Sequence, residues 1–241
     1  MGFEKEILEV VAGNYVADKV LCARRNIVEK VTLRGVEMVV KRYKRPNLFN
    51  RFAYTFIRKT KARRAYEYAF RLLDCGIGTP SPVAYVEVKR CGLFSEGYFF
   101  SLYMPYGMLS DMATETLPVS EELTNDFVDF AFMLHSKGVL PRDFNSSNIF
   151  CWFNEDMEKF CFALTDINRM RFGKVPSVNG IMRSFEQLGV SVEGMYKLAL
   201  CYSSRKNLDM EYSMFLFLLH RMRSRMRRAF KRKTKKKLGL V

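Results

Sequence analysis

The chain has 241 residues, of which 49% are hydrophobic and 14% aromatic, so a sizeable core is expected and a disordered chain is excluded. This length fits one compact domain or a two-lobed domain with a shared cleft. The formal net charge is +15, which favours a polyanionic partner. Two histidines and six scattered cysteines without a Cys-x-x-Cys pair argue against a zinc cluster and favour free thiols in a reducing compartment.

The beginning of the chain shows no targeting pattern. No basic segment precedes an apolar run, so no signal peptide is expected. Glu6 stands where N-myristoylation requires serine or threonine. The longest strongly apolar run near the C-terminus, residues 214–219, is too short to span a bilayer. We therefore expect a cytoplasmic protein.

Residues 27–43 alternate as a β-hairpin does, with the turn at Arg34 and Gly35, and the second strand leads into Lys41. A lysine after two valines at the end of such a strand is where a kinase holds the α- and β-phosphates of ATP. The alternative is an ordinary exposed strand lysine, since lysines such as Lys44 are frequent here.

The turn before this hairpin, residues 23–26, lacks the Gly-x-Gly-x-x-Gly pattern of a phosphate-covering loop. Arg24 and Arg25 could contact phosphate through their side chains. A plain surface turn explains the same residues equally well.

Residues 62–73 have the apolar spacing of an amphipathic helix and contain Glu67, the sole acid of residues 47–73. On a helix packed against the sheet, this carboxylate could pair with Lys41 and fix its ammonium group. From the order along the chain, we favour this pairing. The alternative is a pair with an arginine of the same helix, which contributes roughly a few tenths of a kcal/mol. These arginines are Arg63, Arg64 and Arg71.

The next segments predict the rest of a sheet and the approach to a catalytic loop. Residues 76–82 form a rigid turn rich in glycine and proline. Residues 83–88 and 97–104 are predicted strands, and residues 104–107 break the second one, where a hinge between two lobes would lie. A helix over residues 126–134 then leads to His135.

Residues 135–148 contain an Arg-Asp pair, Arg142 and Asp143, followed by Asn148, and an apolar strand later ends at Asp166. This order is typical of a kinase catalytic centre. Asp143 would orient the attacking hydroxyl and accept its proton. Asn148 and Asp166 would hold Mg²⁺ against the nucleotide phosphates, because this cation prefers carboxylate and amide oxygens. The alternative is a loop of polar turn residues.

The positive charge is concentrated in two segments. Residues 41–64 carry ten Lys or Arg and residues 221–237 carry eleven, with no acid in either, so the other 200 residues sum to −6. In the second segment Met222, Met226 and Phe230 are spaced four apart, as on a basic amphipathic helix. We expect it to bind an anionic membrane. A solvated charge run ranks next, and nucleic acid last, because no aromatic RNA-reading motif interleaves the charges.

Taken together, these motifs resemble the lipopolysaccharide kinase (Kdo/WaaP) family of bacterial, protein-kinase-like enzymes, over about residues 20–175. The segments that carry the resemblance are residues 39–43, 134–139, 142–149 and 166–171. The resemblance implies transfer of the ATP γ-phosphate to Kdo or a heptose of the lipopolysaccharide inner core, at the cytoplasmic face of the inner membrane. It implies that Asp143 is the catalytic base, that Asn148 and Asp166 bind Mg²⁺, and that Lys41 and Glu67 clamp the phosphates of ATP.

The sequence departs from the family pattern in places. Pro141 stands where the family usually has histidine, and Asp166 is followed by Ile-Asn where Phe-Gly is common. Asn145 occupies the position of a lysine in protein kinases, and the family's sugar kinases also tolerate asparagine there. No Ala-Pro-Glu follows Asp166, which argues against a peptide acceptor.

We therefore predict an α+β, bilobal, protein-kinase-like fold: an N-lobe over residues 1–104 with an antiparallel sheet plus a helix, a mostly helical C-lobe over 105–210, and a basic C-terminal helix or tail over 211–241. The predicted function is ATP- and Mg²⁺-dependent phosphorylation of a lipopolysaccharide core sugar, or of its lipid A–Kdo precursor, by a peripheral membrane protein. A protein kinase or pseudokinase regulator, and a non-catalytic basic membrane-binding module, are the alternatives.

Overall fold

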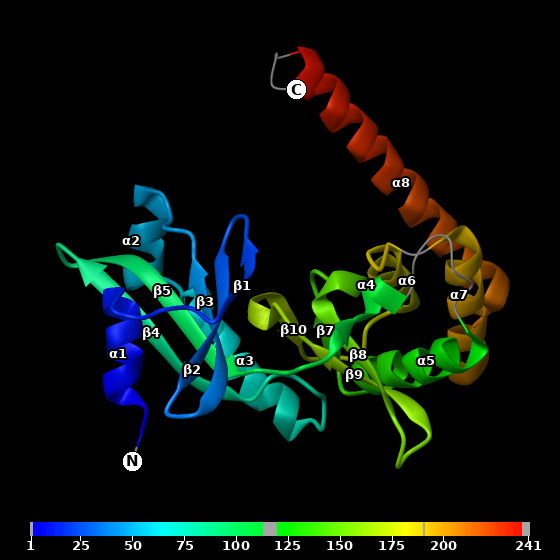
Figure 1. Ribbon diagram of the computed structural model, residues 1–241. Coiled ribbons are helices and arrows are strands. Elements are labelled where there is room, and N and C mark those ends of the chain that lie inside the picture. The colour runs from blue at the N-terminus through cyan, green and yellow to red at the C-terminus, as the bar shows by residue number, and fades with distance from the viewer. Residues whose placement is uncertain (1, 113–119, 190, 238–241) are drawn as a thin grey trace. The chain divides into compact units, whose positions relative to one another are not determined.

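The computed structural model describes residues 2–112, 120–189 and 191–237, with the backbone alone at 235–237. The chain forms two compact units (Figure 1). Unit 1 comprises Met1–Pro105 and Ala163–Arg169, and unit 2 comprises Tyr106–Phe162 and Met170–Val241. The sequence predicted an N-lobe over 1–104, a C-lobe over 105–210 and a separate helix or tail over 211–241. In the structure, residues 163–169 belong to unit 1, and the C-terminal helix is part of unit 2. Residues 238–241 of the predicted tail lie outside the described residues.

The elements of the two units follow the chain with one return to unit 1. The elements of the first segment of unit 1, up to Pro105, are α1 (Glu4–Ala12), β1 (Lys19–Ala23), β2 (Ile27–Leu33), β3 (Val36–Tyr43), α2 (Leu48–Phe56), α3 (Lys61–Asp74), β4 (Pro82–Arg90) and β5 (Leu93–Leu102). Later elements are β6 (Gly107–Met108), α4 (Leu109–Met112), α5 (Glu121–Ser136), β7 (Val139–Pro141), η1 (Ser146–Asn148), β8 (Ile149–Asn154), β9 (Lys159–Leu164), η2 (Ile167–Arg169), β10 (Met170–Phe172), α6 (Val178–Glu186), α7 (Val192–Lys206) and α8 (Met210–Lys237).

Unit 1 is built on an antiparallel five-stranded sheet with the order β1-β2-β3-β5-β4. Helix α1 packs on one face of this sheet, because its apolar side chains join a buried cluster with alternate residues of the strands. The cluster comprises Ile7, Val10, Val31, Met38, Val40, Tyr98 and Phe100. Successive strand residues point to opposite faces, so Lys41, next to Val40, lies on the other face.

That other face is covered by α3, whose buried residues include Ala62, Ala65 and Ala69. Gly97 of β5 pairs with Tyr43 of β3, and a Cβ atom at Gly97 would lie 3.2 Å from the Cβ of Ala62. The missing side chain therefore lets α3 approach the sheet closely. This brings the start of α3 to the face that carries Lys41.

Unit 2 combines the helices α4 to α8 with two small sheets, β10-β7 and β6-β8-β9. Gly138, just before β7, has φ +67, and a Cβ atom there would lie 1.8 Å from the carbonyl oxygen of Gly173. Only glycine fits this close approach, which is closed by a hydrogen bond from Gly173 N to Gly138 O. Strand β7 leads directly into the loop that contains Arg142 and Asp143.

The element types predicted from sequence agree with the structure wherever periodicity was clear. The hairpin over 27–43 is β2–β3, the helix over 62–73 is α3, the two later strands are β4 and β5, and the helix before His135 is α5. The elements that were not predicted individually include α1, α2, α6, α7 and β1. Within the described part of the chain, no helix is both long and apolar enough to cross a membrane.

Candidate functional site

Unit 1 brings Lys41 and Asp166 into direct contact. The Nζ atom of Lys41 lies 2.7 Å from Oδ1 of Asp166, although the two residues are 125 positions apart in the chain. Lys41 is on β3, and its side chain is only 16% exposed, whereas that of Asp166 is 34% exposed. Two of the residues that the sequence singled out are therefore neighbours, a cation on the central strand of the sheet and a carboxylate that follows β9.

The position of Asp166 is fixed by hydrogen bonds to the turn between α3 and β4. Leu164 N donates to Gly78 O at 2.8 Å, and the buried Thr79 hydroxyl donates to Leu164 O at 2.8 Å. Asp166 itself has φ +51, a left-handed conformation that aspartate tolerates better than most residues. The chain thus turns sharply after β9 where its carboxylate meets Lys41. The sequence predicted the turn over residues 76–82 but not the role of Thr79 within it.

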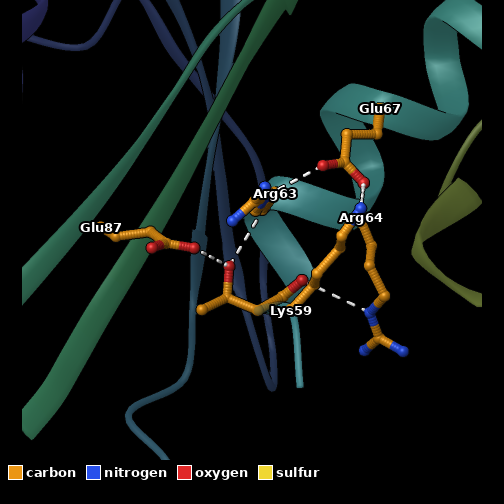
Figure 2. A network of polar contacts seen from close by, with 6 residues as sticks. Lys59, Arg63, Arg64, Glu67 and Glu87 are labelled. Carbon is orange, nitrogen blue, oxygen red and sulfur yellow. Dashed lines mark hydrogen bonds and ion pairs between the residues drawn. The ribbon is translucent and has the colours of Figure 1, made fainter. Parts of the chain in front are cut away.

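The expected ion pair between Lys41 and Glu67 was wrong. The carboxylate of Glu67 lies 2.7 Å from Lys59 Nζ and 2.9 Å from Arg63 Nε (Figure 2). Both partners precede it on the same segment, and Arg63 is one helical turn away, where side chains of a helix meet. Lys41 takes Asp166 as its partner instead. The alternative that paired Glu67 with its own helix is therefore the correct one, and Lys59 adds to it.

The start of α3 is held by Thr60, which is buried. Its hydroxyl accepts a hydrogen bond from Arg63 N and donates one to Glu87 at 2.6 Å. Such an N-cap satisfies a backbone donor that the first turn of a helix leaves open. Arg64 Nε donates to Thr60 O at 3.3 Å. The cap thus fixes the residue at which α3 begins, and with it the positions of the basic residues in its first turn.

Several cations of unit 1 lie close enough to repel one another. The pKa of Lys61 is lowered by its burial and by the positive charges of Arg25, Arg169 and Arg64. Arg25 belongs to the turn between β1 and β2, where the sequence offered arginines in place of a glycine-rich loop. This group, which we call the cation cluster, favours an anion carrying several charges. Sequence reasoning missed Lys61, Arg64 and Arg169, because helix and loop residues of one charge do not reveal their spatial neighbours.

Tyr43 and Asn168 complete the surroundings of Asp166. Asn168 Nδ2 donates to Oδ1 of Asp166, while the amide oxygen of Asn168 is buried and has no partner in the described structure. Burial and the nearby charge of Asp166 raise the pKa of Tyr43, so its hydroxyl stays protonated. An orphaned amide oxygen beside a carboxylate is a suitable environment for a hard cation or its bound water.

Unit 2 carries the loop after β7 that the sequence singled out, and Asp143 is exposed in it. The adjacent Phe144 is buried, stacks on Phe127 with ring centroids 5.9 Å apart, and donates its backbone N–H to Gln187 at 3.0 Å. Asn148 Nδ2 donates to the carbonyl oxygen of Asp143 at 3.1 Å. A buried aromatic anchor therefore fixes the backbone, and the amide oxygen of Asn148 is the atom that could bind a cation.

Asn145 and Pro141 have structural roles on either side of Asp143. The Asn145 side chain accepts hydrogen bonds from the N–H and the hydroxyl of Ser147, so it caps the turn η1. Pro141 is buried at the end of β7, opposite Met170 of β10. Proline is acceptable as the last residue of so short a strand because its fixed φ suits extended backbone.

The residues present fit Mg²⁺ better than they fit a transition metal. No group of three or more His, Cys, Asp or Glu side chains that could hold a metal ion occurs among the described residues. Mg²⁺ is usually held by one or two carboxylates together with substrate phosphates, which matches a single aspartate with asparagine amides. Asp166 of unit 1 and Asn148 of unit 2 each carry an oxygen of the kind that Mg²⁺ prefers.

Comparisons with known proteins identify the fold. No protein-family model matches the sequence, and no curated protein matches it. The solved structure of WaaP in complex with acyl carrier protein is similar, with a TM-score of 0.60 over 91% of this chain and 92% of that chain, at 14% sequence identity. The chain therefore has the protein-kinase-like α+β fold of WaaP, as its motifs indicated.

Proposed function

We propose that this protein is an ATP- and Mg²⁺-dependent kinase that phosphorylates a sugar, Kdo or a heptose, of the lipopolysaccharide inner core. The observation that carries the proposal is the 2.7 Å ion pair between Lys41 and Asp166 in a chain with the fold of WaaP. A lysine of the third strand next to the carboxylate after β9 is the arrangement from which a kinase clamps phosphates and metal together.

Each residue has a separate task in the proposed reaction. The Asp143 carboxylate orients the sugar hydroxyl and accepts its proton as the oxygen–phosphorus bond forms and ADP leaves. Lys41 holds the α- and β-phosphates, while Asp166 and Asn148 hold Mg²⁺, which when bound neutralises charge on the phosphate oxygens. Catalysis then consists of positioning and charge neutralisation. Glu67 has no part in it, since its carboxylate is taken by Lys59 and Arg63.

The cation cluster supports a highly charged ligand in unit 1. Lys61 is partly buried beside three arginines and one carboxylate, that of Asp166, and this excess of positive charge costs free energy unless a further anion binds. Arg25 stands in the turn where other kinases place backbone N–H groups of a glycine-rich loop. We infer that arginine side chains perform here the phosphate contacts that glycine backbone makes elsewhere.

The proposed location is the cytoplasmic face of the inner membrane, with α8 as the contact. The exposed apolar side chains of α8 share one side of the helix, with basic residues between them. They are Tyr212, Phe215, Leu218, Met222, Met226 and Phe230. An anionic bilayer would attract the eleven basic residues of 221–237 and accept this apolar stripe. No nucleic-acid partner is proposed.

The test is mass spectrometry of lipid A–core from cells with the protein, without it, and with Asp143→Asn. One phosphate on an inner-core sugar should be present in the first case and missing in the other two. In vitro, the full chain with ATP and Mg²⁺ should transfer labelled phosphate to the core isolated from the deleted cells. Identical core in all three strains would contradict the proposal.

A nucleotide-binding pseudokinase is the second candidate, and the separation of Glu67 from Lys41 favours it, because active protein kinases require a lysine–glutamate pair. Pro141 and the missing glycine-rich loop point the same way. A pseudokinase binds ATP with or without Mg²⁺ but does not turn it over. Measuring ADP release by the full chain, with and without isolated core, separates the two.

A further inference from the structure

Helix α2 of unit 1 exposes an apolar surface. Its five large apolar side chains are between 53% and 80% exposed, far more than side chains that pack in a core. They are Leu48, Phe49, Phe52 and Phe56 of the helix and Ile57, which follows it. The rings of Phe52 and Phe56 are in contact, with centroids 4.8 Å apart. We call these five residues the α2 face.

The α2 face projects outward because the other side of the helix is fastened to β5. Arg51 Nε donates to Phe94 O at 2.8 Å, Phe94 N donates to the Thr55 hydroxyl at 2.9 Å, and Tyr54 packs edge-on against the Phe94 ring. Ala53 is buried on this side. The helix is thus held by tertiary contacts that do not use its exposed phenylalanines, so their exposure needs another explanation.

The surroundings of the α2 face are positive. Residues 41–64 carry ten Lys or Arg and no acid. Lys59 and Arg63 share the single carboxylate of Glu67. Lys44 and Arg45 lie exposed just before α2, and Arg58, just after it, lies over the Tyr54 ring. Cations therefore border both ends of the apolar surface.

We propose that the α2 face inserts into the interfacial region of an anionic lipid bilayer, with Lys44, Arg45 and Arg58 at the level of the lipid phosphates. Short helices that combine exposed phenylalanine or leucine with flanking basic residues lie in the plane of such interfaces. Burying apolar side chains and attracting anionic headgroups contribute together. The contact is made by unit 1, is separate from α8 and does not depend on phosphoryl transfer.

A bilayer fits this surface better than a protein does. Protein interfaces combine apolar contacts with about one hydrogen bond per 100–200 Å². The side chains of the α2 face have no hydrogen-bonding group, and the basic groups at its ends are exposed. A bilayer interior makes no directional demand, and its headgroups accept cations at any nearby position. An acidic protein, such as an acyl carrier protein, is the occupant against which the proposal must be tested.

The first test measures binding of the full chain to vesicles of phosphatidylglycerol and phosphatidylcholine by co-sedimentation. Phe49→Ser/Phe52→Ser should lower the partition coefficient about tenfold or more, because two partly buried rings are lost from the bilayer. Leu8→Ser/Val16→Ser removes two exposed apolar side chains outside the basic segment and should change nothing. Phe49→Ser/Phe52→Ser should lower the partition coefficient by the same factor in a chain whose α8 also carries Lys231→Gln/Arg232→Gln/Lys233→Gln.

The second test reports insertion directly and requires no loss of binding. The tryptophan introduced by Phe52→Trp should be quenched by brominated lipids more than the one introduced by Leu8→Trp, with the native Trp152 common to both proteins. Equal quenching in the two variants, or equal partitioning of Phe49→Ser/Phe52→Ser and the parent chain, overturns the proposal. So does loss of binding to purified acyl carrier protein in Phe49→Ser/Phe52→Ser with vesicle binding unchanged, because the occupant is then a protein.

Discussion

The ammonium group of Lys41 and the carboxylate of Asp166 lie 2.7 Å apart, so a strand of the unit 1 sheet and the segment after β9 meet in one ion pair. Both side chains are partly buried, which strengthens a charge-assisted hydrogen bond relative to one in water. Since Asp166 is also the proposed metal ligand, any nucleotide that binds must share this carboxylate and this lysine.

Asp166→Asn should weaken the affinity for nucleotide with Mg²⁺ by roughly 10- to 100-fold, because a neutral amide is a poorer ligand and a poorer partner for Lys41. Titration with a fluorescent ATP analogue, with Mg²⁺ and with EDTA, measures the effect. The affinity without metal should fall much less. An equal loss in both conditions would mean that Asp166 acts only through Lys41.

Asp143→Asn should bind nucleotide with Mg²⁺ normally and lose phosphoryl transfer by about 10²- to 10⁴-fold, because the amide cannot accept the proton of the attacking hydroxyl. Asp143 is exposed on a loop anchored by buried Phe144, so the substitution should leave the fold intact. The measurement is single-turnover transfer from labelled ATP. Near-normal turnover would remove Asp143 from the role of base.

Glu67→Gln should leave nucleotide affinity and turnover unchanged, in contrast to the same substitution in a kinase that pairs this glutamate with the strand lysine. Its partners are Lys59 and Arg63 near the surface, and such pairs contribute about 0–1 kcal/mol to stability. Lys41→Met is the matched comparison and should abolish nucleotide binding. Loss of activity in both variants would show that Glu67 moves to Lys41 during the reaction.

Stability should fall in mild acid because of His135. It is fully buried, its Nδ1 lies 2.8 Å from the Tyr202 hydroxyl, and burial together with Lys206 lowers its pKa to about 3. The unfolded chain takes up this proton near pH 6.5, whereas the folded one does not until far lower pH. Folding is therefore favoured above pH 6.5 and loses up to about 1.4 kcal/mol per pH unit below it.

Urea unfolding of the full chain between pH 7 and pH 5 measures this loss, which should approach about 2 kcal/mol at pH 5 from His135 alone. His135→Phe removes the titrating group and keeps a ring beside Phe185 and Tyr202. Its stability should decline less steeply over the same range, whatever its value at pH 7. Parallel curves for the two proteins would exclude His135 as the source.

The α8 contact should be electrostatic. Lys231→Gln/Arg232→Gln/Lys233→Gln should lower binding to anionic vesicles roughly 100-fold, since each basic residue near a charged surface contributes about 1 kcal/mol. Binding of the parent chain should also fall steeply with salt, because such attraction is screened within about 8 Å at physiological ionic strength.

The matched control for α8 is Lys5→Gln/Lys19→Gln/Lys89→Gln, which removes the same charge from exposed positions elsewhere. It should bind vesicles as the parent chain does, and both variants should phosphorylate a soluble sugar analogue at the parent rate. Equal losses in the two triple variants would mean that net charge alone, and not α8, attracts the membrane.

The sequence by itself determined the elements whose information is local. Alternating residues and a turn at Gly35 specify the β2–β3 hairpin, and helical spacing specifies α3. The order of Asp143, Asn148 and Asp166 along the chain is the basis of the proposed kinase chemistry. These features can be recognised in the sequence alone because strand, helix and turn preferences act between residues a few positions apart.

Tertiary structure decided which side chains meet. From the sequence, Glu67 could pair with a cation of its own segment or with Lys41 on a distant strand. The structure pairs it with Lys59 and Arg63. The orientation of α3 on the sheet, which the Thr60 cap and the close approach at Gly97 set, decides between them. The cation cluster and the α2 face arise in the same way. Long-range pairing depends on how helices pack on a sheet, and a linear pattern of charge or hydrophobicity does not contain that geometry.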